Sequence, residues 1–140
     1  MSQEQSRERP DHDYVRAYKN GLSTMKILIV DDDENNLLLT KLELRDECWH
    51  VITASDGQEA MELFDNENPD MIIVDIKMPG IDGLTLLKKM KAIKPEIPVA
   101  IFTGYDLTSL TVPDEADAVM IKSSSYEELK EFVRRYAPHK

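Results

Sequence analysis

The sequence predicts an α/β protein in which five parallel strands form one sheet with helices on both faces, a doubly wound arrangement. Five short apolar runs, 27–30, 50–53, 71–74, 99–102 and 118–121, alternate with amphipathic stretches of helical period. Several runs are apolar at every position, as strands are when helices bury both of their faces. The alternation of strands and helices therefore predicts a parallel sheet with helical crossovers.

The helices are predicted from apolar residues at helical spacing and from boundary signals. Leu37, Leu38, Leu42 and Leu44 predict the first helix, and Asp33 is its expected N-cap. Further helices are predicted around 60–64, 84–90 and 126–136.

Composition indicates a soluble, single-domain protein. The 140 residues are 41% hydrophobic, and no apolar run approaches the ~20 residues of a membrane span. The net charge of −10 belongs to the part after residue 25, which argues against nucleic-acid binding and favours protein partners or cations. A single cysteine, Cys48, fits a reducing cytoplasm. We divide the chain into an N-terminal extension, 1–25, with a short helix from Asp13 to Asn20 or no fixed structure, and one domain, 26–138.

Polar side chains follow four of the five predicted strands. These are Asp31, Asp32 and Asp33 after the first, Asp75 after the third, Thr103 after the fourth and Lys122 after the fifth. Ligands of doubly wound sheets bind outside the carboxyl ends of the strands, so these groups are expected to converge. Two carboxylates about 6 Å apart repel by roughly 3 kcal/mol at an effective dielectric of about 20. Asp31, Asp32 and Asp75 therefore need a cation.

The residue types favour magnesium and phosphoryl chemistry. Oxygen ligands on a rigid sheet edge suit Mg²⁺. The three carboxylates carry −3, whereas Mg²⁺ and Lys122 together carry +3, so the loaded site can receive a phosphoryl group. Lys122 is predicted to bind one phosphoryl oxygen and Thr103 to donate a hydrogen bond to another. Asp75 is the predicted nucleophile.

Over about residues 26–138 the chain resembles the receiver domain of two-component response regulators, the CheY-like family with a flavodoxin-like sheet. The resemblance is nearest to stand-alone receivers of the sporulation phosphorelay type. It is carried by Ile29-Val30-Asp31-Asp32, Val74-Asp75-Ile76-Lys77-Met78-Pro79-Gly80-Ile81-Asp82-Gly83, Phe102-Thr103-Gly104 and Ile121-Lys122.

The resemblance implies that Asp75 takes a phosphoryl group from a histidine kinase or a histidine phosphotransfer protein. A receiver is a signalling domain that catalyses its own phosphorylation and dephosphorylation. The resemblance also implies Mg²⁺ bound directly by Asp32 and Asp75, through water by Asp31, and by the backbone carbonyl of Lys77. It implies a downstream protein target, allows a homodimer, and places Lys77 and Tyr105 where receivers tune the lifetime of the phosphate.

Three departures from the family pattern fall between Tyr105 and Ser123. Ser123 replaces the proline that usually follows the lysine, so a trans peptide bond is expected there. Val119 replaces the usual aromatic residue of the switch, which predicts weak coupling to Thr103. The stretch between Thr103 and Lys122 is short for the family and contains Pro113, which leaves little more than one turn, 107–110, of the usual fourth helix. We therefore expect the fourth helix to be shortened or irregular, and signalling and dimerisation through that face to be changed.

Two rival hypotheses remain from the sequence. A degenerate receiver would act as a phosphorylation-independent interaction module, which the altered region favours and the complete acidic site opposes. A phosphatase of the haloacid-dehalogenase type would use Asp31-x-Asp33, but Asn35 stands where Thr or Val is usual, and no later Asp-Asp pair follows. A calcium loop is excluded because Asn36 stands where glycine is needed.

Overall fold

The computed structural model of the chain describes residues 25–45, 49–76, 82–104, 114–122 and 126–136. Five strands form one sheet in the order β2-β1-β3-β4-β5, and every neighbouring pair is parallel. They are β1 (Lys26–Val30), β2 (His50–Ala54), β3 (Met71–Val74), β4 (Val99–Thr103) and β5 (Ala118–Ile121). The predicted parallel sheet is confirmed, and each predicted strand agrees with its observed bounds to within one residue.

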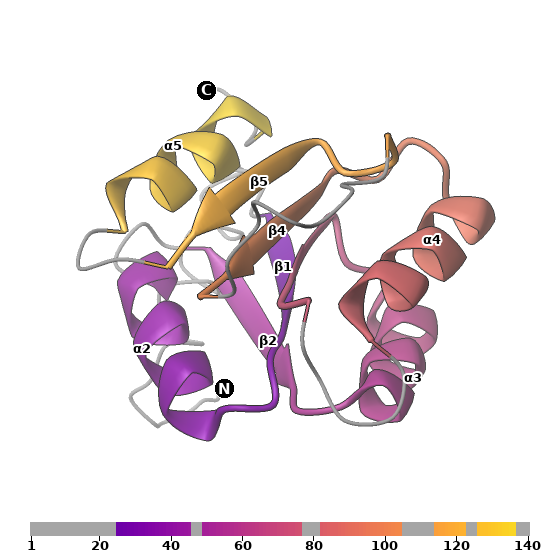
Figure 1. Cartoon of the computed structure of the whole chain (residues 1–140), viewed down its shortest axis with the longest axis horizontal. Coiled ribbons are helices and arrows are strands. Elements are labelled where there is room, and N and C mark those ends of the chain that lie inside the picture. Colours follow the sequence, from indigo (N-terminus) through magenta and orange to yellow (C-terminus); the bar gives the residue numbers. More distant parts are fainter. Residues whose placement is uncertain (1–24, 46–48, 77–81, 105–113, 123–125, 137–140) are drawn as a thin grey trace, which may run out of the picture.

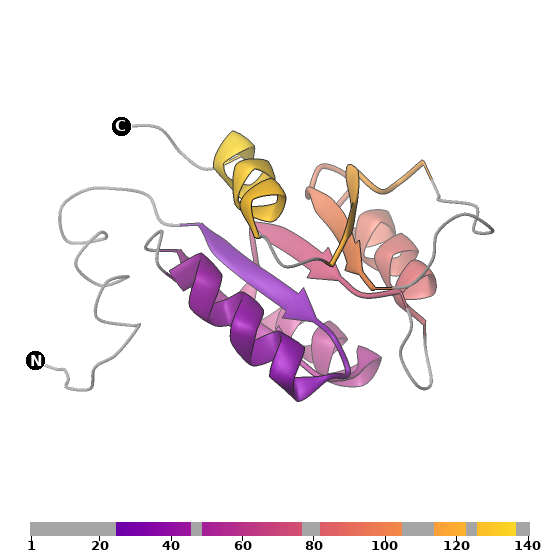
Figure 2. The ribbon, with the colours of Figure 1, turned by 60° about the vertical axis from the view of Figure 1, so that its left-hand side comes forward.

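Helices cover both faces of the sheet. The helices α2 (Glu34–Arg45) and α5 (Glu127–Tyr136) lie on one face, and α3 (Gly57–Glu67) and α4 (Gly83–Ile93) lie on the other (Figure 1). The turned view in Figure 2 shows the same layers. None of the described helices is long and apolar enough to cross a membrane. The expected helix at 107–110, the expected helix from Asp13 to Asn20, and the residues Lys77, Tyr105, Pro113 and Ser123 lie outside the described residues.

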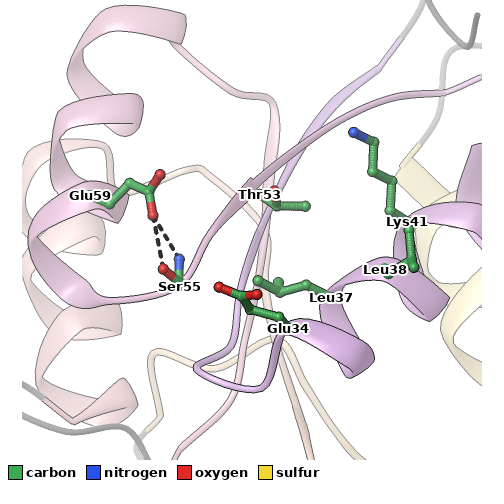
Figure 3. Close-up of a pocket in the computed structure, with 7 residues that line it drawn as sticks. All are labelled: Glu34, Leu37, Leu38, Lys41, Thr53, Ser55 and Glu59. Carbon is green, nitrogen blue, oxygen red and sulfur yellow. Dashed lines mark hydrogen bonds between the residues drawn. The ribbon is translucent and has the colours of Figure 1, made fainter.

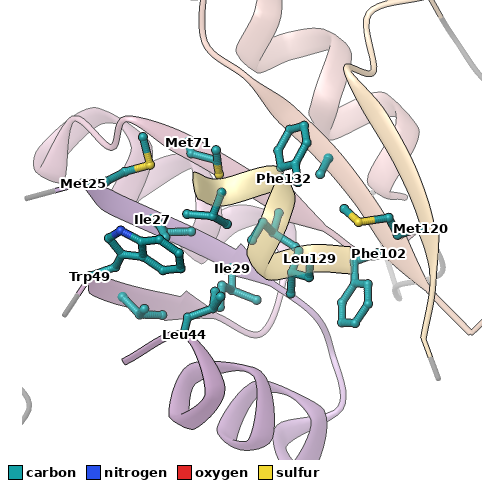
Figure 4. Packing of buried hydrophobic residues seen from close by; sticks show 14 of the residues in the cluster. Met25, Ile27, Ile29, Leu44, Trp49, Met71, Phe102, Met120, Leu129 and Phe132 are labelled. Atoms are coloured by element: carbon teal, nitrogen blue, oxygen red, sulfur yellow. The ribbon is translucent and has the colours of Figure 1, made fainter. Parts of the chain in front are cut away.

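The central strands β1, β3 and β4 contain unbroken apolar runs because each strand contributes to two cores. In β1, Ile27 and Ile29 pack under α2 and α5, and Leu28 and Val30 pack under α3 and α4. All four are at most 3% exposed. Figure 4 shows the first core, in which Trp49 lies beside Ile27 at one end of the sheet and α5 covers the middle. Burial on both faces is the physical reason for the unbroken apolar runs.

The leucines of α2 divide between a buried face and an exposed face. Leu37 and Leu44 are buried, but Leu38 and Leu42 are 54% and 42% exposed, and the adjacent Leu39 is 51% exposed. The inward face of α2 follows Leu37, Thr40 and Leu44, at the spacing of one helix stripe. The helix predicted from these leucines is therefore present, and Leu38, Leu39 and Leu42 form an apolar patch on its outer side.

Polar residues set the helix boundaries. Asp33 begins α2, and its Oδ1 accepts the backbone N–H groups of Asn35 and Asn36 at 2.9 and 3.2 Å, which confirms the predicted N-cap. Asp56 and Asp82 cap α3 and α4 in the same way. These caps place three helix starts at the carboxyl edge of the sheet.

Gly83, at the start of α4, lies directly against the chain that follows β3. Its amide donates a hydrogen bond to the carbonyl of Ile76 at 2.8 Å. A Cβ at this position would lie 2.0 Å from the carbonyl oxygen of Asp75 and 2.8 Å from the Cα of Ile76. Both contacts are with backbone atoms, so no side-chain rotation can relieve them. A glycine is required here for the close approach.

Gly83→Ala should lower the free energy of unfolding by at least about 2 kcal/mol, because the new methyl group must displace the Asp75 backbone. The matched control is Gly104→Ala, since a Cβ on Gly104 meets nothing within 4 Å. This variant should stay within about 0.5 kcal/mol of the parent. Urea unfolding measures both, and equal stabilities of the two variants would contradict the packing argument.

Candidate functional site

The carboxyl edge of the sheet brings together side chains from three separate strands. Asp31 follows β1, Asp75 follows β3 and Lys122 follows β5. Each is held by a backbone hydrogen bond that extends the sheet by one residue: Asp31 N to Ala54 O at 3.1 Å, Asp75 N to Val30 O at 2.9 Å, and Lys122 N to Thr103 O at 2.8 Å. The sheet therefore holds the backbone at all three of these residues.

Lys122 joins the two acids. Its Nζ pairs with Oδ2 of Asp31 and, at 3.0 Å, with Oδ2 of Asp75. The side chains are 6% exposed for Asp31, 11% for Asp75 and 17% for Lys122, so the ammonium is largely withdrawn from water. Oδ1 of Asp31 accepts the backbone N–H of Asp33 at 2.9 Å. Oδ1 of Asp75, by contrast, is buried and has no hydrogen-bond partner among the described residues.

The pKa values of Asp31 and Lys122 are shifted by burial and by these contacts. Burial raises the pKa of Asp31, and the hydrogen bonds from Lys122 and from the Asp33 amide offset this only in part. For Lys122, burial acts to lower the pKa, but the hydrogen bonds to Asp31 and Asp75 and their charges outweigh it, so the pKa is raised. Lys122 therefore stays an ammonium, but its single positive charge does not neutralise the carboxylates around it.

Asp31, Asp32 and Asp75 fit a divalent cation that prefers oxygen. One carboxylate oxygen from each lies within 4.8 Å of the others, and Asp32 is exposed beside the two buried acids. Three carboxylates carry −3, and Lys122 supplies only +1. An all-carboxylate donor set, with one oxygen of Asp75 still unpartnered, suits Mg²⁺.

The sequence-predicted residues can now be placed. Asp31, Asp32, Asp75 and Lys122 come together as expected. Thr103 ends β4 and is 1% exposed, and its backbone oxygen accepts a hydrogen bond from the Lys122 amide. The carbonyl of Lys77 lies outside the described residues. The sequence did not predict two features of the site: the direct contact of Lys122 with Asp31, and the close approach of Gly83 to the backbone of Asp75. Gly83 does belong to the segment 74–83 that carries the resemblance to receivers, and this could have drawn attention to it.

A groove of about 330 Å³ lies at the same edge, between the start of α2, the end of β2 and the start of α3 (Figure 3). It is lined by Glu34, Leu37, Leu38, Lys41, Thr53, Ser55 and Glu59. Oε1 of Glu59 accepts the amide and hydroxyl of Ser55 at 2.9 and 3.2 Å, as part of the α3 start. The three clustered aspartates are not among the lining residues, so this groove is distinct from the acidic site.

The chain matches a known protein family and is similar to known proteins. Residues 27–134 match the family described as response regulator receiver domain. Sporulation initiation phosphotransferase F of Bacillus subtilis is 34% identical over 118 residues, which cover 82% of this chain and 95% of that protein. The transcriptional regulatory protein TrcR of Mycobacterium tuberculosis is 36% identical over 119 residues, 81% of this chain but only 46% of that protein.

Solved structures show the same similarity. The response regulator TrrA of Thermotoga maritima, in complex with Mg²⁺ and BeF, has a TM-score of 0.76 and 36% identity, and covers 80% of this chain and 98% of its own. TrrA in complex with the histidine kinase ThkA has a TM-score of 0.74 and 35% identity, covering 80% and 97%.

Lys122→Met should lower the metal-free free energy of unfolding by on the order of 3 kcal/mol, because two largely buried carboxylates lose their counter-charge. Adding Asp31→Asn to this variant should recover part of the loss, since one of the repelling charges is removed. The exposed Lys89 is the control, and Lys89→Met should change stability by less than about 0.5 kcal/mol. The account of the ion pair is refuted if urea unfolding shows similar losses for Lys122→Met and Lys89→Met.

Proposed function

Because the chain belongs to the response regulator receiver family, we propose that it accepts a phosphoryl group on Asp75 from a phosphohistidine of a histidine kinase or phosphotransfer protein. The reaction depends on Mg²⁺, and the phosphorylated domain signals through protein contacts in the cytoplasm. The observation that supports this most is the environment of Asp75, a buried carboxylate with one unpartnered oxygen, beside Asp31 and an ammonium.

The charges of the site support a role for Mg²⁺. Asp31, Asp32 and Asp75 would hold the ion, which supplies two positive charges next to the carboxylate that reacts. With Lys122 the sum over these groups rises from −2 to zero, so an incoming phosphoryl group is no longer repelled. Asp31 and Asp32 would thus act by holding the cation, whereas Asp75 would both help to hold it and supply the oxygen that reacts.

The transfer itself is a displacement at phosphorus. A carboxylate oxygen of Asp75 forms the new P–O bond while the P–N bond to the donor imidazole breaks and its electron pair returns to nitrogen. The phosphoryl oxygens need donors in place of water. Lys122, whose Nζ lies 3.0 Å from Oδ2 of Asp75, would exchange a carboxylate contact for a phosphoryl oxygen, and the Thr103 hydroxyl would bind another.

The apolar patch on α2 supports a docking site for the histidine donor. Leu38, Leu39 and Leu42 are exposed on the helix that starts directly after the acidic residues Asp31–Asp33. Leu38 also lines the groove at the carboxyl edge of the sheet. An exposed apolar helix face that reaches this edge suits a partner helix that carries the phosphohistidine. The similarity to TrrA, which forms a complex with the kinase ThkA, supports the same partner class.

Incubation with acetyl phosphate and Mg²⁺ should add one phosphoryl group to the chain, and Asp75→Asn should abolish the addition. The control is Asp33→Asn, because asparagine preserves the α2 cap while removing a neighbouring acid. Intact-mass and peptide mass spectrometry measure the amount and the position. A phosphoryl group on Asp31 would favour the phosphatase alternative. A folded protein that takes none, from acetyl phosphate or from histidine kinases, would favour the phosphorylation-independent module.

Replacing Leu38 and Leu39 by serine should slow phosphoryl transfer from a histidine kinase at least about tenfold, since lost interface burial of this size is worth more than about 1.4 kcal/mol. Labelling by acetyl phosphate should not change, because that small donor needs no docking surface. Ile93, which is 60% exposed on the opposite face of the sheet, supplies the control Ile93→Ser. The kinase used for this experiment is the histidine kinase of the source cell that transfers its phosphoryl group fastest to the parent protein. Equal slowing by Ile93→Ser would place the docking surface elsewhere.

A further inference from the structure

The strand that delivers Lys122 to the site is weakly anchored by apolar contacts. β5 has four residues, lies at the edge of the sheet and pairs only with β4. Met120 is its one fully buried side chain, whereas Ala118 and Val119 are half-buried and Ile121 is 47% exposed. A slip of one residue moves a strand by about 3.3 Å and turns every side chain to the other face. The position of Lys122 therefore depends on how the register of β5 is set.

Asp117 fixes that register at the start of β5. Its amide donates to the carbonyl of Val99 at 2.8 Å, and its Oδ2 accepts the amide of Val99 at 2.8 Å. The two residues thus exchange two hydrogen bonds, so Asp117 can pair with only one residue of β4. The Nζ of Lys91, on α4, lies 3.0 Å from the same Oδ2 and holds the carboxylate in place.

Among the described residues, the main-chain contact at the opposite end of β5 is the hydrogen bond from Lys122 N to Thr103 O. Between the two ends the ladder pairs Ala118 with Ala100 and Ile121 with Thr103. Lys122 is five residues beyond Asp117, about 16 Å along an extended strand. At that separation the two side chains cannot touch, and only the strand can transmit an effect between them.

We propose that Asp117 is a positioning residue for the site: by binding the Val99 amide and the Lys91 ammonium it sets the register of β5 and so holds the Lys122 ammonium between Asp31 and Asp75. The placement of Lys122 is independent of the proposed function, and its consequence for phosphorylation rests on that function.

The placement is tested by NMR of lysine ammonium groups. In the parent protein the Lys122 ammonium is shielded by two carboxylates, so it should give a ¹⁵N-edited signal, identified by its loss in Lys122→Arg. Asp117→Ala should abolish this signal while the other signals of the folded protein persist. Glu115→Ala, at an exposed acid two residues earlier, should leave it unchanged. If Asp117→Ala does not fold, Lys91→Met is measured in its place. This variant removes the ammonium that holds the Asp117 carboxylate, so it should weaken the Lys122 signal. An unchanged Lys122 signal in the folded variants overturns the proposal.

A rate measurement separates positioning from general destabilisation. Asp117→Ala should slow labelling of Asp75 by acetyl phosphate and Mg²⁺ at least about tenfold, as small misplacements of reacting groups do. In a Lys122→Ala background the same substitution should have no further effect, since its effect passes through Lys122. The same slowing in both backgrounds overturns the proposal. If the parent protein is not labelled at all, the proposed function fails, and the NMR result still decides the role of Asp117.

Discussion

Two buried carboxylates that share one ammonium are the constraint on which the site depends. Asp31 and Asp75 follow adjacent strands, and a parallel sheet necessarily brings the carboxyl ends of both to the same edge. Isolated charges at this depth would be very costly, so each must have a partner. Lys122 provides that partner from β5, and the surrounding structure maintains the geometry. Backbone bonds extend the strands by one residue, Gly83 allows α4 to approach Asp75, and Asp117 anchors the far end of β5.

The same constraint leaves a deficit of positive charge, and this deficit links stability to chemistry. One ammonium cannot neutralise three carboxylates, and burial keeps the pKa of Asp31 raised despite its contact with Lys122. A fold selected only for stability would have neutral residues here, since apolar replacements of buried charges are often stabilising. The acids are better explained by a divalent cation that they bind and by an anionic group that the loaded site can receive. The proposed phosphorylation of Asp75 uses both properties.

Sequence reasoning located the sheet and the acidic site because both follow from short-range patterns. The runs at β1, β3 and β4 are apolar at each position, and the acids directly follow them, so topology alone brings Asp31 next to Asp75. The features that sequence reasoning did not locate depend on how a helix is rotated about its axis and on close contacts between side chains. Five leucines in α2 fit more than one helical face, so the exposure of Leu38 and Leu42 was not predictable. The contact of Lys122 with Asp31 depends on the register of an edge strand, which a hydrogen bond of Asp117 helps to set.

The most direct test is a ¹H–¹⁵N NMR titration of the parent protein with Mg²⁺, followed by beryllofluoride as a phosphoryl mimic. Mg²⁺ should shift the amides of Asp31, Asp32 and Asp75, and beryllofluoride should then shift those of Thr103 and Lys122. Neither addition should have this effect on Asp75→Asn. If the shifts are absent, or are confined to the groove around Glu34 and Glu59, the carboxyl edge is not the site that binds the cation and receives the phosphoryl group.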